Sequence, residues 1–479
     1  MRLYDTKARS VVEIVPVRPG QLSIYACGPT VYRDAHVGNM RSFLLPDLIC
    51  RVAQSQGLTT HLVQNITDVG HMADDTGLGG VDEGQADTED RILAQAGLEG
   101  RGALELARGY EARFHEDLAA LNIRPAQAYP RASESIPLMI DLIQVLLDRG
   151  HAYVGSDGSV FFDATSVADY GALSGNRLED LRPGHRFTAE MDSAKRFHAD
   201  WALWKHAGDS RTQLVWETPW GRGYPGWHTE CSAMSLDQFG SSIDVHTGGI
   251  DLRFPHHEDE RAQSNAASAG SVAGGSAEVV QHWVHGEHLL FAGRKMSKST
   301  GNVVLVRDLV DRGLDPLSLR LAFLQHRYRQ QFNLTWEVLQ TADGQLRRWR
   351  ERVAEWAEAP SAPIPADLQA AFELPCQEDL DTPRALQLLR EAERIEDLAD
   401  GAKFEFFAWA DQILGLDLVR DVGKAPQPVP ESVQRLMEER AQARLDKLWA
   451  RSDELRDAMA ELGWQVRDTP EGQQVTPTR

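Results

Sequence analysis

Long apolar runs are missing from this 479-residue sequence, and their absence excludes a membrane-spanning helix. No stretch reaches the roughly 18 apolar residues that a span requires. The opening residues, MRLYDTKARSVVEIV, also lack the apolar core of a secretory signal. Cysteine is scarce, and the four cysteines are widely scattered, at Cys27, Cys50, Cys231 and Cys376. Scattered cysteines in a chain without a leader predict reduced thiols and a cytoplasmic protein, not a disulfide framework.

Positive charge is also in short supply, because 50 Lys and Arg face 71 Asp and Glu, a net charge of −21. Such a balance argues against a nonspecific nucleic-acid binder, since phosphate contacts need cations. Any nucleic-acid contact therefore requires cations that are gathered locally. Residues 320–352 carry one such group: Arg320, Arg327, Arg329, Arg347, Arg348, Arg350 and Arg352. From charge alone, a solvated helical face is the preferred interpretation of this segment.

The spacing of apolar residues predicts an α/β fold in the first half of the chain. Residues 22–28 have the pattern of a buried strand, residues 40–52 that of a helix and residues 60–67 that of the next strand. Strand, helix and strand at this spacing predict a parallel βαβ unit. Pro46 lies inside the helix pattern and is expected to kink or break the helix.

The second half of the chain has a different character. A further α/β stretch covers residues 155–292, and beyond residue 304 the pattern is nearly all helical. Two Pro-rich segments, 359–366 and 424–432, are the best linker candidates. The tail is expected to form a short hairpin around Pro470 and Gly472.

The first chemistry-bearing motif is Cys27-Gly28-Pro29-Thr30, followed by His36-Val37-Gly38-Asn39. The end of a buried parallel strand is where open sheets bind ligands. His36 then opens a helix, whose N-terminal N–H groups and dipole favour phosphate. Gly38 lets a nucleotide approach the backbone closely. HVGN alone is a weak signal that usually only caps a helix, but its place between strand and helix favours a nucleotide site.

The second motif pairs GWHTECSAM, residues 226–234, with HTGGIDLRFPHHEDE, residues 246–260. Cys231, His256, His257 and Glu260 are all possible zinc ligands. His256 and Glu260 are four residues apart and share one face of a helix. Two alternatives remain open, because no CxxC pair is present: Cys231 as an inert core thiol and HHEDE as a solvated helix start. From spacing alone, a zinc site is no better supported than these alternatives.

The third motif is Arg294-Lys295-Met296-Ser297-Lys298 and the following Ser-Thr-Gly-Asn. Two lysines three apart, among hydroxyls and before a glycine, suit a loop that clamps phosphates. Their expected role is to stabilise negative charge as it develops on a leaving pyrophosphate. The alternative is a basic surface turn, but KMSKS is a far more specific pattern than HVGN.

An early HVGN and a late KMSKS around a split nucleotide fold resemble the class I aminoacyl-tRNA synthetases. The segments YACGPTVY, NITDVGH, PGWHTECSAM, FPHHEDE and KMSKSTGN are similar to the cysteinyl-tRNA synthetases specifically. The resemblance extends over nearly the whole chain. It implies a Rossmann-like parallel-sheet nucleotide-binding catalytic domain with an insertion, followed by an α-helical C-terminal bundle. The implied activity is ATP-dependent activation of L-cysteine and its transfer to tRNA(Cys).

The resemblance also implies site residues and cofactors. One Zn²⁺ per chain would be held by Cys27, Cys231, His256 and Glu260, with His257 as a neighbour, and Mg²⁺ would accompany ATP. Thr67, Trp227 and His246 would line the cysteine site. His36, Gly38, Asn39, Asp251, Lys295 and Lys298 would bind ATP, with His36, Asn39, Lys295 and Lys298 acting in catalysis. Asn39 replaces the final His of the family's HIGH motif and cannot carry charge.

In the C-terminal part, Arg444, Trp449, Asp453, Arg456 and Asp468 fall on family positions that read the anticodon. The resemblance divides the chain into a catalytic domain over 1–303, with an insertion at about 125–205, a stem-contact region over 304–358, and an anticodon-binding domain over 365–479. A monomer is expected, although no residue pattern indicates an oligomeric state.

Two other functions are weighed against this one. The first is a related ATP-dependent ligase that joins cysteine to an amino sugar, which would need no helical extension over 365–479. The second is a catalytically silent paralogue that binds tRNA, which the intact Lys295, Lys298 and metal-ligand candidates argue against. Zinc would explain selectivity, because packing alone rejects a near-isostere such as serine by only roughly 10²-fold, whereas a soft thiolate binds zinc in a different way from a hydroxyl.

Overall fold

Four parallel strands form the central sheet, in the order β11-β10-β3-β4. They are β3 (Gln21–Ala26), β4 (Thr59–Gln64), β10 (Ile243–Gly249) and β11 (Val280–Gly286). The computed structural model describes residues 1–70, 90–181, 194–209, 211–268, 278–296, 301–424, 429–469 and 472–477. The chain divides into two units, Met1–Arg420 and Asp421–Arg479, and the sheet belongs to the first.

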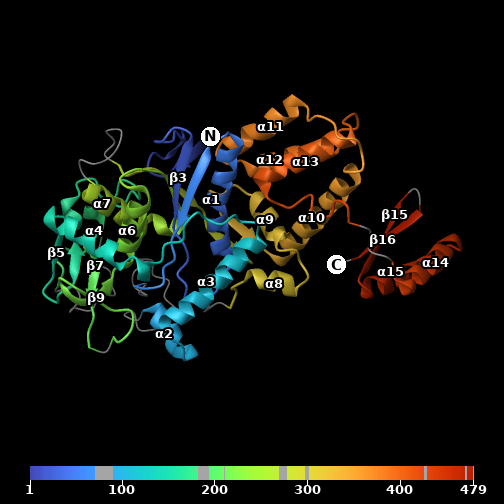
Figure 1. The fold of residues 1–479 in the computed structure, drawn as a ribbon. Coiled ribbons are helices and arrows are strands. Elements are labelled where there is room, and N and C mark those ends of the chain that lie inside the picture. The colour runs from blue at the N-terminus through green and yellow to red at the C-terminus, as the bar shows by residue number, and fades with distance from the viewer. Residues whose placement is uncertain are drawn as a thin grey trace. The chain divides into compact units, whose positions relative to one another are not determined.

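The order of the strands fixes where a ligand can bind. Helix α1 (Val37–Ser55) connects β3 to β4, and α7 (His256–Ser268) connects β10 to β11. The strand order therefore reverses between β3 and β10, where Ala26 pairs with Thr247. In open parallel sheets, the crevice at this reversal, outside the carboxyl ends of the strands, is the ligand site. Figure 1 shows α1 running alongside β3.

Helix α1 begins three residues before the predicted start and continues without a break through Pro46. The expected break is therefore wrong. Burial explains this result, since the residues from Phe43 to Ala53 are all buried and tertiary packing outweighs the intrinsic cost of proline in a helix.

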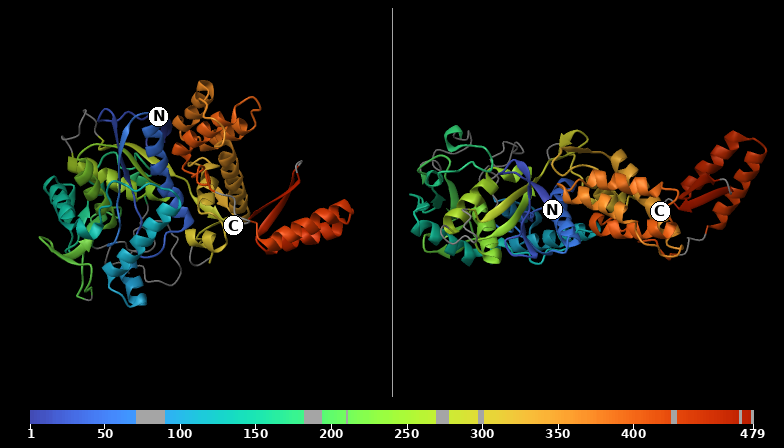
Figure 2. Two further views of the ribbon diagram at one scale, coloured as in Figure 1. Left: turned by 45° about the vertical axis from the view of Figure 1, so that its right-hand side comes forward. Right: turned by 90° about the horizontal axis from the view of Figure 1, so that it is seen from above.

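An antiparallel insertion lies between β4 and β10. Its sheet has the order β5-β6-β7-β9-β8. The strands are β5 (Ala152–Val154), β6 (Val160–Phe162), β7 (Trp201–His206), β8 (Trp216–Thr218) and β9 (Gly221–Pro225). Helices α2 (Arg91–Glu99), α3 (Ala103–Ala120) and α4 (Ile136–Asp148) precede this sheet, and α6 (Trp227–Phe239) follows it. In both views of Figure 2 the insertion lies beside α6 and α7.

The remaining elements of the first unit are a hairpin, a small sheet and a helical region. The hairpin pairs β1 (Arg2–Asp5) with β2 (Ser10–Glu13). The small sheet contains β12 (Leu289–Phe291), β13 (Arg294–Lys295) and β14 (Phe332–Leu334). The helices are α8 (Val306–Asp311), α9 (Leu317–Leu324), α10 (Trp336–Trp356), α11 (Ala366–Gln377), α12 (Thr382–Glu393) and α13 (Asp400–Leu414). The predicted fold class is confirmed: a parallel sheet with an insertion, followed by helices.

A buried ion cluster links α1 to the helical region. Asp47 accepts hydrogen bonds from Arg51 and Arg320, both at 2.8 Å, and from Arg124 at 3.3 Å. Arg320 also donates to the carbonyl of Leu414, which ends α13. Burial raises the pKa of Asp47, but the guanidinium groups of Arg320 and Arg51 more than offset that effect and lower it. One carboxylate therefore holds together helices from distant parts of the sequence.

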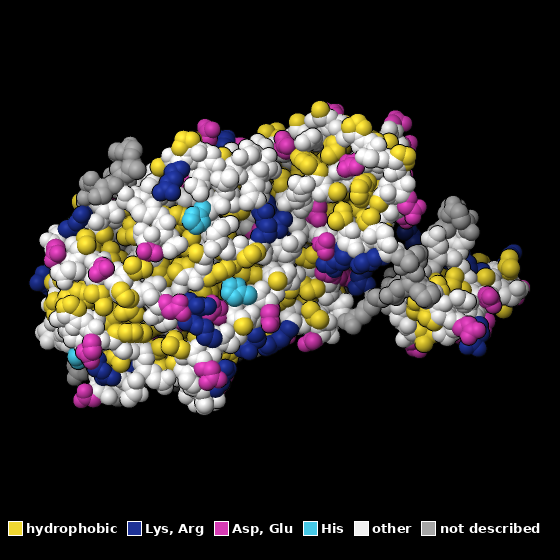
Figure 3. Space-filling model, viewed as in Figure 1, with side chains coloured by type: hydrophobic (Ala, Val, Ile, Leu, Met, Phe, Trp, Pro, Cys, Tyr) yellow, Lys and Arg dark blue, Asp and Glu magenta, His cyan; other side chains and the backbone are white. Residues whose placement is uncertain are grey.

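The arginine-rich segment 320–352 is mainly structural. Arg320 and Arg350 are buried, which a solvated helical face does not allow, so the preferred interpretation of the sequence is wrong for these two residues. The other five arginines form ion pairs: Arg327–Asp381, Arg329–Asp379, Arg347–Asp343, Arg348–Glu393 and Arg352–Glu355. Figure 3 shows many Lys and Arg side chains of the first unit lying beside Asp or Glu. Internal pairing explains how these arginines coexist with the acidic composition.

The second unit consists of two helices and a hairpin. Helices α14 (Glu431–Leu445) and α15 (Trp449–Glu461) precede the antiparallel strands β15 (Trp464–Thr469) and β16 (Gly472–Pro477). Its small core is formed by Val433, Met459 and Trp464. Among the described residues of both units, no helix is long and apolar enough to cross a membrane.

Candidate active site

Buried thiols, imidazoles and carboxylates gather at the carboxyl end of the central sheet. Cys27 directly follows β3, Cys231 lies in the second turn of α6, and His256 and Glu260 stand one turn apart at the start of α7. All four are buried, Cys27 being the most accessible at 7%. Their potential ligand atoms lie within 4.8 Å of one another. The reversal of strand order thus brings together four donors from three separate segments.

The donor chemistry of this cluster fits a thiophilic metal ion. Sulfur, imidazole nitrogen and carboxylate oxygen are all zinc ligands, and thiolates select zinc over hard cations such as Mg²⁺. The Sγ atoms of Cys27 and Cys231 are 4.0 Å apart, and Glu260 Oε1 is 2.8 Å from His256 Nε2. Such close approach of buried polar donors from three segments is expected where a cation satisfies them together.

A second donor set overlaps the first. Cys27, His246, His257 and Glu260 also present one ligand atom each within 4.8 Å. The two sets share Cys27 and Glu260 and differ in the other two donors. Geometry among the described residues therefore defines a cluster that could hold a metal ion, the metal-binding cluster, and leaves two choices for its ligands.

Outer hydrogen bonds orient several members of the cluster. His246 Nε2 lies 3.0 Å from Glu260 Oε2, and His228 Nδ1 lies 2.9 Å from His256 Nδ1. His257 Nε2 lies 3.2 Å from Cys27 Sγ. Metal-binding side chains are usually held by such partners, which fix the ring tautomer and the ligand's orientation.

Burial and neighbouring charges shift the pKa values of the side chains in this cluster. Burial raises the pKa of Glu260, but His256 and His246 outweigh burial and hold it well below its usual range. Burial lowers the pKa of His256, while Glu260 and Cys231 raise it to about 10. Burial lowers the pKa of His257 far below its ordinary value. The cluster thus concentrates negative charge at Glu260, where a cation would be stabilised.

The N-terminus of α1 forms a second part of the site. His36 Nδ1 accepts a hydrogen bond from the backbone N–H of Asn39, and Asn39 Oδ1 accepts one from the N–H of His36, both at 3.2 Å. This capping box shows that HVGN caps the helix, the role that such a tetrapeptide usually has. Burial, with the nearby Arg33, lowers the pKa of His36 to about 4, so its ring is neutral at pH 7.

Gly38 lies in close contact with two neighbouring side chains. A Cβ atom at Gly38 would lie 2.8 Å from Met296 Cε and 2.9 Å from the His36 ring. Met296 belongs to the KMSKS segment, so Gly38 allows that segment to approach α1. Lys295 is exposed and contributes to the lowered pKa of His36, which places its charge near the same helix end. Lys298 lies outside the described residues.

The remaining predicted ligand-binding residues surround these two parts. Asp251 is exposed just after β10, where a Cβ atom on Gly249 would meet both its carboxylate and Ser42 of α1. Trp227 stacks on His256 with ring centroids 4.1 Å apart. Thr67 is buried after β4 and accepts a hydrogen bond from the backbone of Val31.

The five predicted anticodon residues lie in the second unit. Arg444 Nη1 is 3.1 Å from Asp468 Oδ2, and its guanidinium lies 5.9 Å from the ring centroid of Trp449. Trp449 is 58% exposed, unusually high for so large an apolar side chain. Asp453 and Arg456 form an exposed ion pair on α15. The structure thus brings Arg444, Trp449 and Asp468 together from α14, α15 and β15.

Reasoning from the sequence missed three members of the buried network. His228 stands three residues before Cys231, and that spacing could have indicated it. His285 is the next-to-last residue of β11 and lies beside Gly248, a pairing that only the sheet register reveals. Thr6, in the turn after β1, hydrogen-bonds His285 and carries no signal in the sequence.

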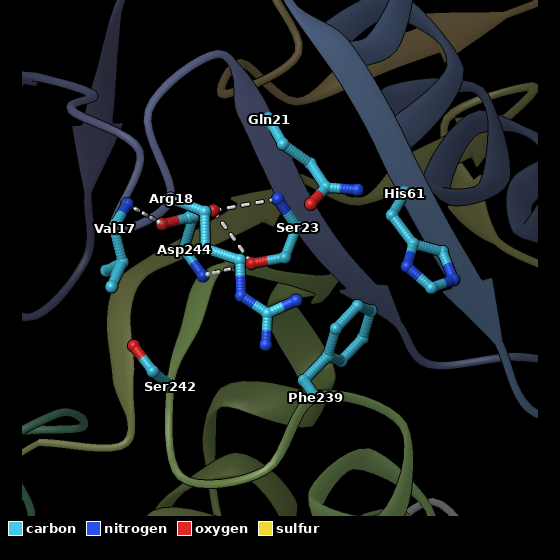
Figure 4. Close-up of a pocket in the computed structure, with 8 residues that line it drawn as sticks. All are labelled: Val17, Arg18, Gln21, Ser23, His61, Phe239, Ser242 and Asp244. Carbon is cyan, nitrogen blue, oxygen red and sulfur yellow. Dashed lines mark hydrogen bonds between the residues drawn. The ribbon is translucent and has the colours of Figure 1, made fainter. Parts of the chain in front are cut away.

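One cavity lies away from this site. It measures about 30 Å³, and Ser23, His61, Phe239 and Asp244 are among its lining residues. Figure 4 shows Asp244 hydrogen-bonded to Ser23 and to the backbone N–H of Val17. Ser23, His61 and Asp244 lie in the amino-terminal halves of β3, β4 and β10, at the end of the sheet opposite the crevice, and Asp244 joins β10 to β3.

Comparison with known proteins agrees with the geometry. Residues 13–75 and 83–344 match the family model for the class I (C) tRNA synthetase catalytic domain, and residues 427–475 match the cysteinyl-tRNA ligase anticodon binding domain. A cysteine–tRNA ligase of Thermus thermophilus is 41% identical, covering 98% of both chains. Cysteine–tRNA ligase 1 of Burkholderia lata is 39% identical, covering 99% of this chain and 96% of its own.

Solved structures show the same fold. The methionyl-tRNA synthetase of Mycobacterium tuberculosis, in complex with methionyl-adenylate, aligns with a TM-score of 0.53 at 15% identity, covering 84% of this chain and 91% of its own. A LeuRS of Agrobacterium radiobacter K84, in a ternary complex with tRNA and LeuAMS, gives 0.58 at 10% identity and covers 84% of both chains.

The parallel sheet, its insertion and the crevice motifs define a class I aminoacyl-tRNA synthetase. Full-length relatives at about 40% identity identify the family within that class. The chain belongs to the cysteinyl-tRNA synthetase family, and its activity is that of a cysteine–tRNA ligase. That activity implies L-cysteine, ATP and tRNA(Cys) as its substrates. The match to an anticodon-binding domain argues against a ligase for an amino sugar.

Proposed function

We propose that the buried cluster is a zinc site held by Cys27, Cys231, His256 and Glu260, and that it selects cysteine by its thiol. The observation that carries this proposal is the approach of all four ligand atoms to within 4.8 Å in a buried site. Bound zinc supplies a soft Lewis acid that favours a thiolate over a hydroxyl. We expect one bound zinc ion per chain.

The outer hydrogen bonds favour this ligand set over the overlapping one. If Glu260 Oε1 faces the metal, Oε2 is left to accept the hydrogen bond from His246 Nε2. His256 then uses Nε2 as its ligand atom, while Nδ1 meets His228. In the other set His246 would be a ligand, yet its Nδ1 has no hydrogen-bond partner among the described residues. A metal-bound imidazole almost always engages its second nitrogen.

We assign the cysteine site to the walls of the cluster. Trp227 stacks on His256 and can cover the substrate side of that ring. His246 donates from Nε2 to Glu260, so its Nδ1 remains an acceptor for the substrate. Thr67 completes the site from the end of β4. A buried site of this kind excludes water, and we propose that the cysteine carboxylate faces α1.

The adenylation step follows from the second part of the site. A carboxylate oxygen of cysteine bonds to the α-phosphorus of ATP, and the bond between that phosphorus and the bridging oxygen breaks to release pyrophosphate. The protein positions these groups and stabilises their charge. We assign the ribose to Asp251, the phosphates to Gly38, neutral His36 and the α1 N-terminus, and the leaving pyrophosphate with its Mg²⁺ to Lys295 and Lys298. Asn39 supports the site by capping α1.

Transfer completes the reaction. The terminal hydroxyl of tRNA attacks the adenylate carbonyl, an ester forms, and AMP leaves. An exchange assay between ATP and pyrophosphate tests the first step, and charging of tRNA(Cys) tests the second. We expect both activities to require cysteine. Exchange without charging would favour a ligase with another acceptor, and the absence of both would favour a silent paralogue.

We further propose that Arg444, Trp449, Asp453, Arg456 and Asp468 bind the anticodon. Exposed Trp449 offers a face on which an unpaired base can stack, and Arg444 and Asp468 beside it offer hydrogen bonds to base edges. The domain boundaries proposed from the sequence, with the anticodon domain beginning near residue 365, assign α11–α13 to the same functional region.

Replacing Trp449 with alanine should weaken tRNA charging while sparing cysteine-dependent exchange. The expected loss is about 1–3 kcal/mol in kcat/KM for tRNA, the usual contribution of base stacking. Steady-state charging at limiting tRNA measures it. Trp464→Ala is the control for packing, because Trp464 is 7% exposed and belongs to the core of the second unit. Normal charging by a folded Trp449→Ala protein would limit Trp449 to a surface role.

A further inference from the structure

A chain of hydrogen bonds runs from the first hairpin into the metal-binding cluster. Thr6 Oγ1 lies 2.7 Å from His285 Nδ1, and His285 Nε2 lies 2.8 Å from His257 Nδ1. His257 Nε2 then lies 3.2 Å from Cys27 Sγ. All four residues are buried, the most accessible being Thr6 at 8%. The hydrogen bonds from Thr6 to Cys27 are therefore largely shielded from solvent.

The backbone is shaped to admit this chain. Gly248 of β10 lies against the His257 ring, and a Cβ atom there would sit 2.6 Å from His257 Cε1 and 3.0 Å from Nε2. Thr6 is held by its own N–H, which donates to the carbonyl of Trp283 on β11. His285 pairs with Gly248 in the sheet register. The backbone thus fixes Thr6 at one end of these hydrogen bonds and His285 in the middle.

A thiolate at Cys27 sets the direction of every hydrogen bond in the chain. A metal-bound thiolate can only accept, so His257 must carry its proton on Nε2. A neutral ring leaves Nδ1 of His257 as an acceptor, and His285 must then donate from its own Nε2. His285 Nδ1 in turn accepts, and the donor is the Thr6 hydroxyl. Every donor and acceptor is used, with one proton on each ring.

We propose that Thr6, His285 and His257 are positioning residues that deliver one N–H donor to the Cys27 thiolate and so fix its orientation and donor strength. The proposal rests on the proposed zinc site with Cys27 as a ligand. In the overlapping ligand set, His257 Nε2 would bind the metal and every proton in the chain would lie on the opposite nitrogen. The direction of these hydrogen bonds therefore distinguishes the two ligand sets.

The N–H donor changes the sulfur in a measurable way. A hydrogen bond to a thiolate withdraws electron density and lowers the energy of the sulfur lone pairs. With Co²⁺ in place of zinc, removal of that hydrogen bond shifts the sulfur-to-metal charge-transfer band to longer wavelength. Loss of an outer partner also weakens metal binding, typically by roughly 10–100-fold. A residue that only packs against the cluster would not shift the band in this direction.

The test compares Thr6→Val with Thr6→Ser in the full-length protein. Valine keeps the shape and removes the hydroxyl, whereas serine retains it. For Thr6→Val we expect zinc to be lost to a chelator about 10-fold more readily and the Co²⁺ band to move to longer wavelength. For Thr6→Ser we expect wild-type behaviour. Thr382→Val is the matched control, because Thr382 is also buried but lies in α12, outside the cluster.

A second measurement needs no variant at Thr6. Imidazole ¹⁵N shifts of the zinc-loaded protein, with His257 identified by loss of its signals in His257→Phe, give the tautomer of the ring. We expect the proton on Nε2. A proton on Nδ1 would overturn the proposal and favour His257 as the ligand.

The outcomes separate this inference from the proposed function. If the wild-type protein takes up neither zinc nor Co²⁺, the proposed metal site itself is wrong. The wild-type protein could instead bind both ions, while Thr6→Val matches it in zinc loss to a chelator and in the position of the Co²⁺ band. The metal site would then stand, and the proposed positioning role of Thr6 would be wrong.

Discussion

Replacing Cys231 with serine is expected to remove the bound metal and cysteine activation together. Cys231 is 1% exposed, and its Sγ lies 4.0 Å from that of Cys27. A hydroxyl is a poor substitute for a soft thiolate ligand, so zinc affinity should fall by more than the roughly 10–100-fold that loss of an outer partner causes. Metal content of the purified protein and cysteine-dependent ATP–pyrophosphate exchange measure the two effects.

Cys376→Ser is the matched control for this substitution. Cys376 is also 1% exposed, but it lies in α11 and burial raises the pKa of its thiol to about 12. We expect that variant to retain the metal and exchange activity, although the buried hydroxyl lowers its stability. Full zinc occupancy and normal exchange in Cys231→Ser would show that Cys231 is not a ligand and would leave the set with His246 and His257.

The second large effect concerns stability. Asp47→Asn should destabilise the first unit by about 3–5 kcal/mol, because it removes the carboxylate that pairs directly with two buried guanidinium groups. The side chains of Asp47 and Arg320 are completely buried, and Arg51 is 6% exposed. The NH₂ group of the asparagine side chain would also face the N–H groups of Arg51 and Arg320, and two donors cannot form a hydrogen bond. Urea unfolding followed by tryptophan fluorescence measures the loss.

Glu355→Gln provides the comparison, since it removes a charge from an exposed pair with Arg352 in α10. Exposed pairs contribute about 0–1 kcal/mol, so we expect little change. Equal effects of the two substitutions would mean that the Asp47 cluster does not couple α1 to the helical region. A loss confined to Asp47→Asn would support that coupling.

Sequence reasoning reached the fold class and the family because their signals are local. The strand before Cys27, the helix after His36 and the helical pattern beyond residue 304 depend on apolar spacing, and the structure confirms them. The continuity of α1 through Pro46 was not predictable, because helix propensity takes no account of burial. The burial of Arg320 and Arg350 was not predictable because their acidic partners, Asp47 and Asp315, are distant in sequence.

The site was predictable to the extent that its motifs are contiguous. HVGN, KMSKS and HHEDE could be read directly, and the grouping of Cys27 with Cys231 followed only from family resemblance. The hydrogen bonds around the cluster could not be predicted, because they depend on sheet register. His285 reaches His257 only because β11 lies beside β10, and Thr6 reaches His285 only because β1 lies against that edge. Asn39 was expected to contact phosphate, and the geometry of α1 shows that its side chain caps the helix.

The measurement that tests the account most directly compares cysteine with serine in ATP–pyrophosphate exchange by the zinc-loaded protein. A site that relied on packing would prefer cysteine over its hydroxyl analogue by only roughly 10²-fold. Recognition of the thiol by a metal held between Cys27, Cys231, His256 and Glu260 predicts a ratio of kcat/KM values far above that, and collapse of cysteine activation once the metal is removed. A ratio near roughly 10², or exchange that survives complete removal of the metal, would contradict the account.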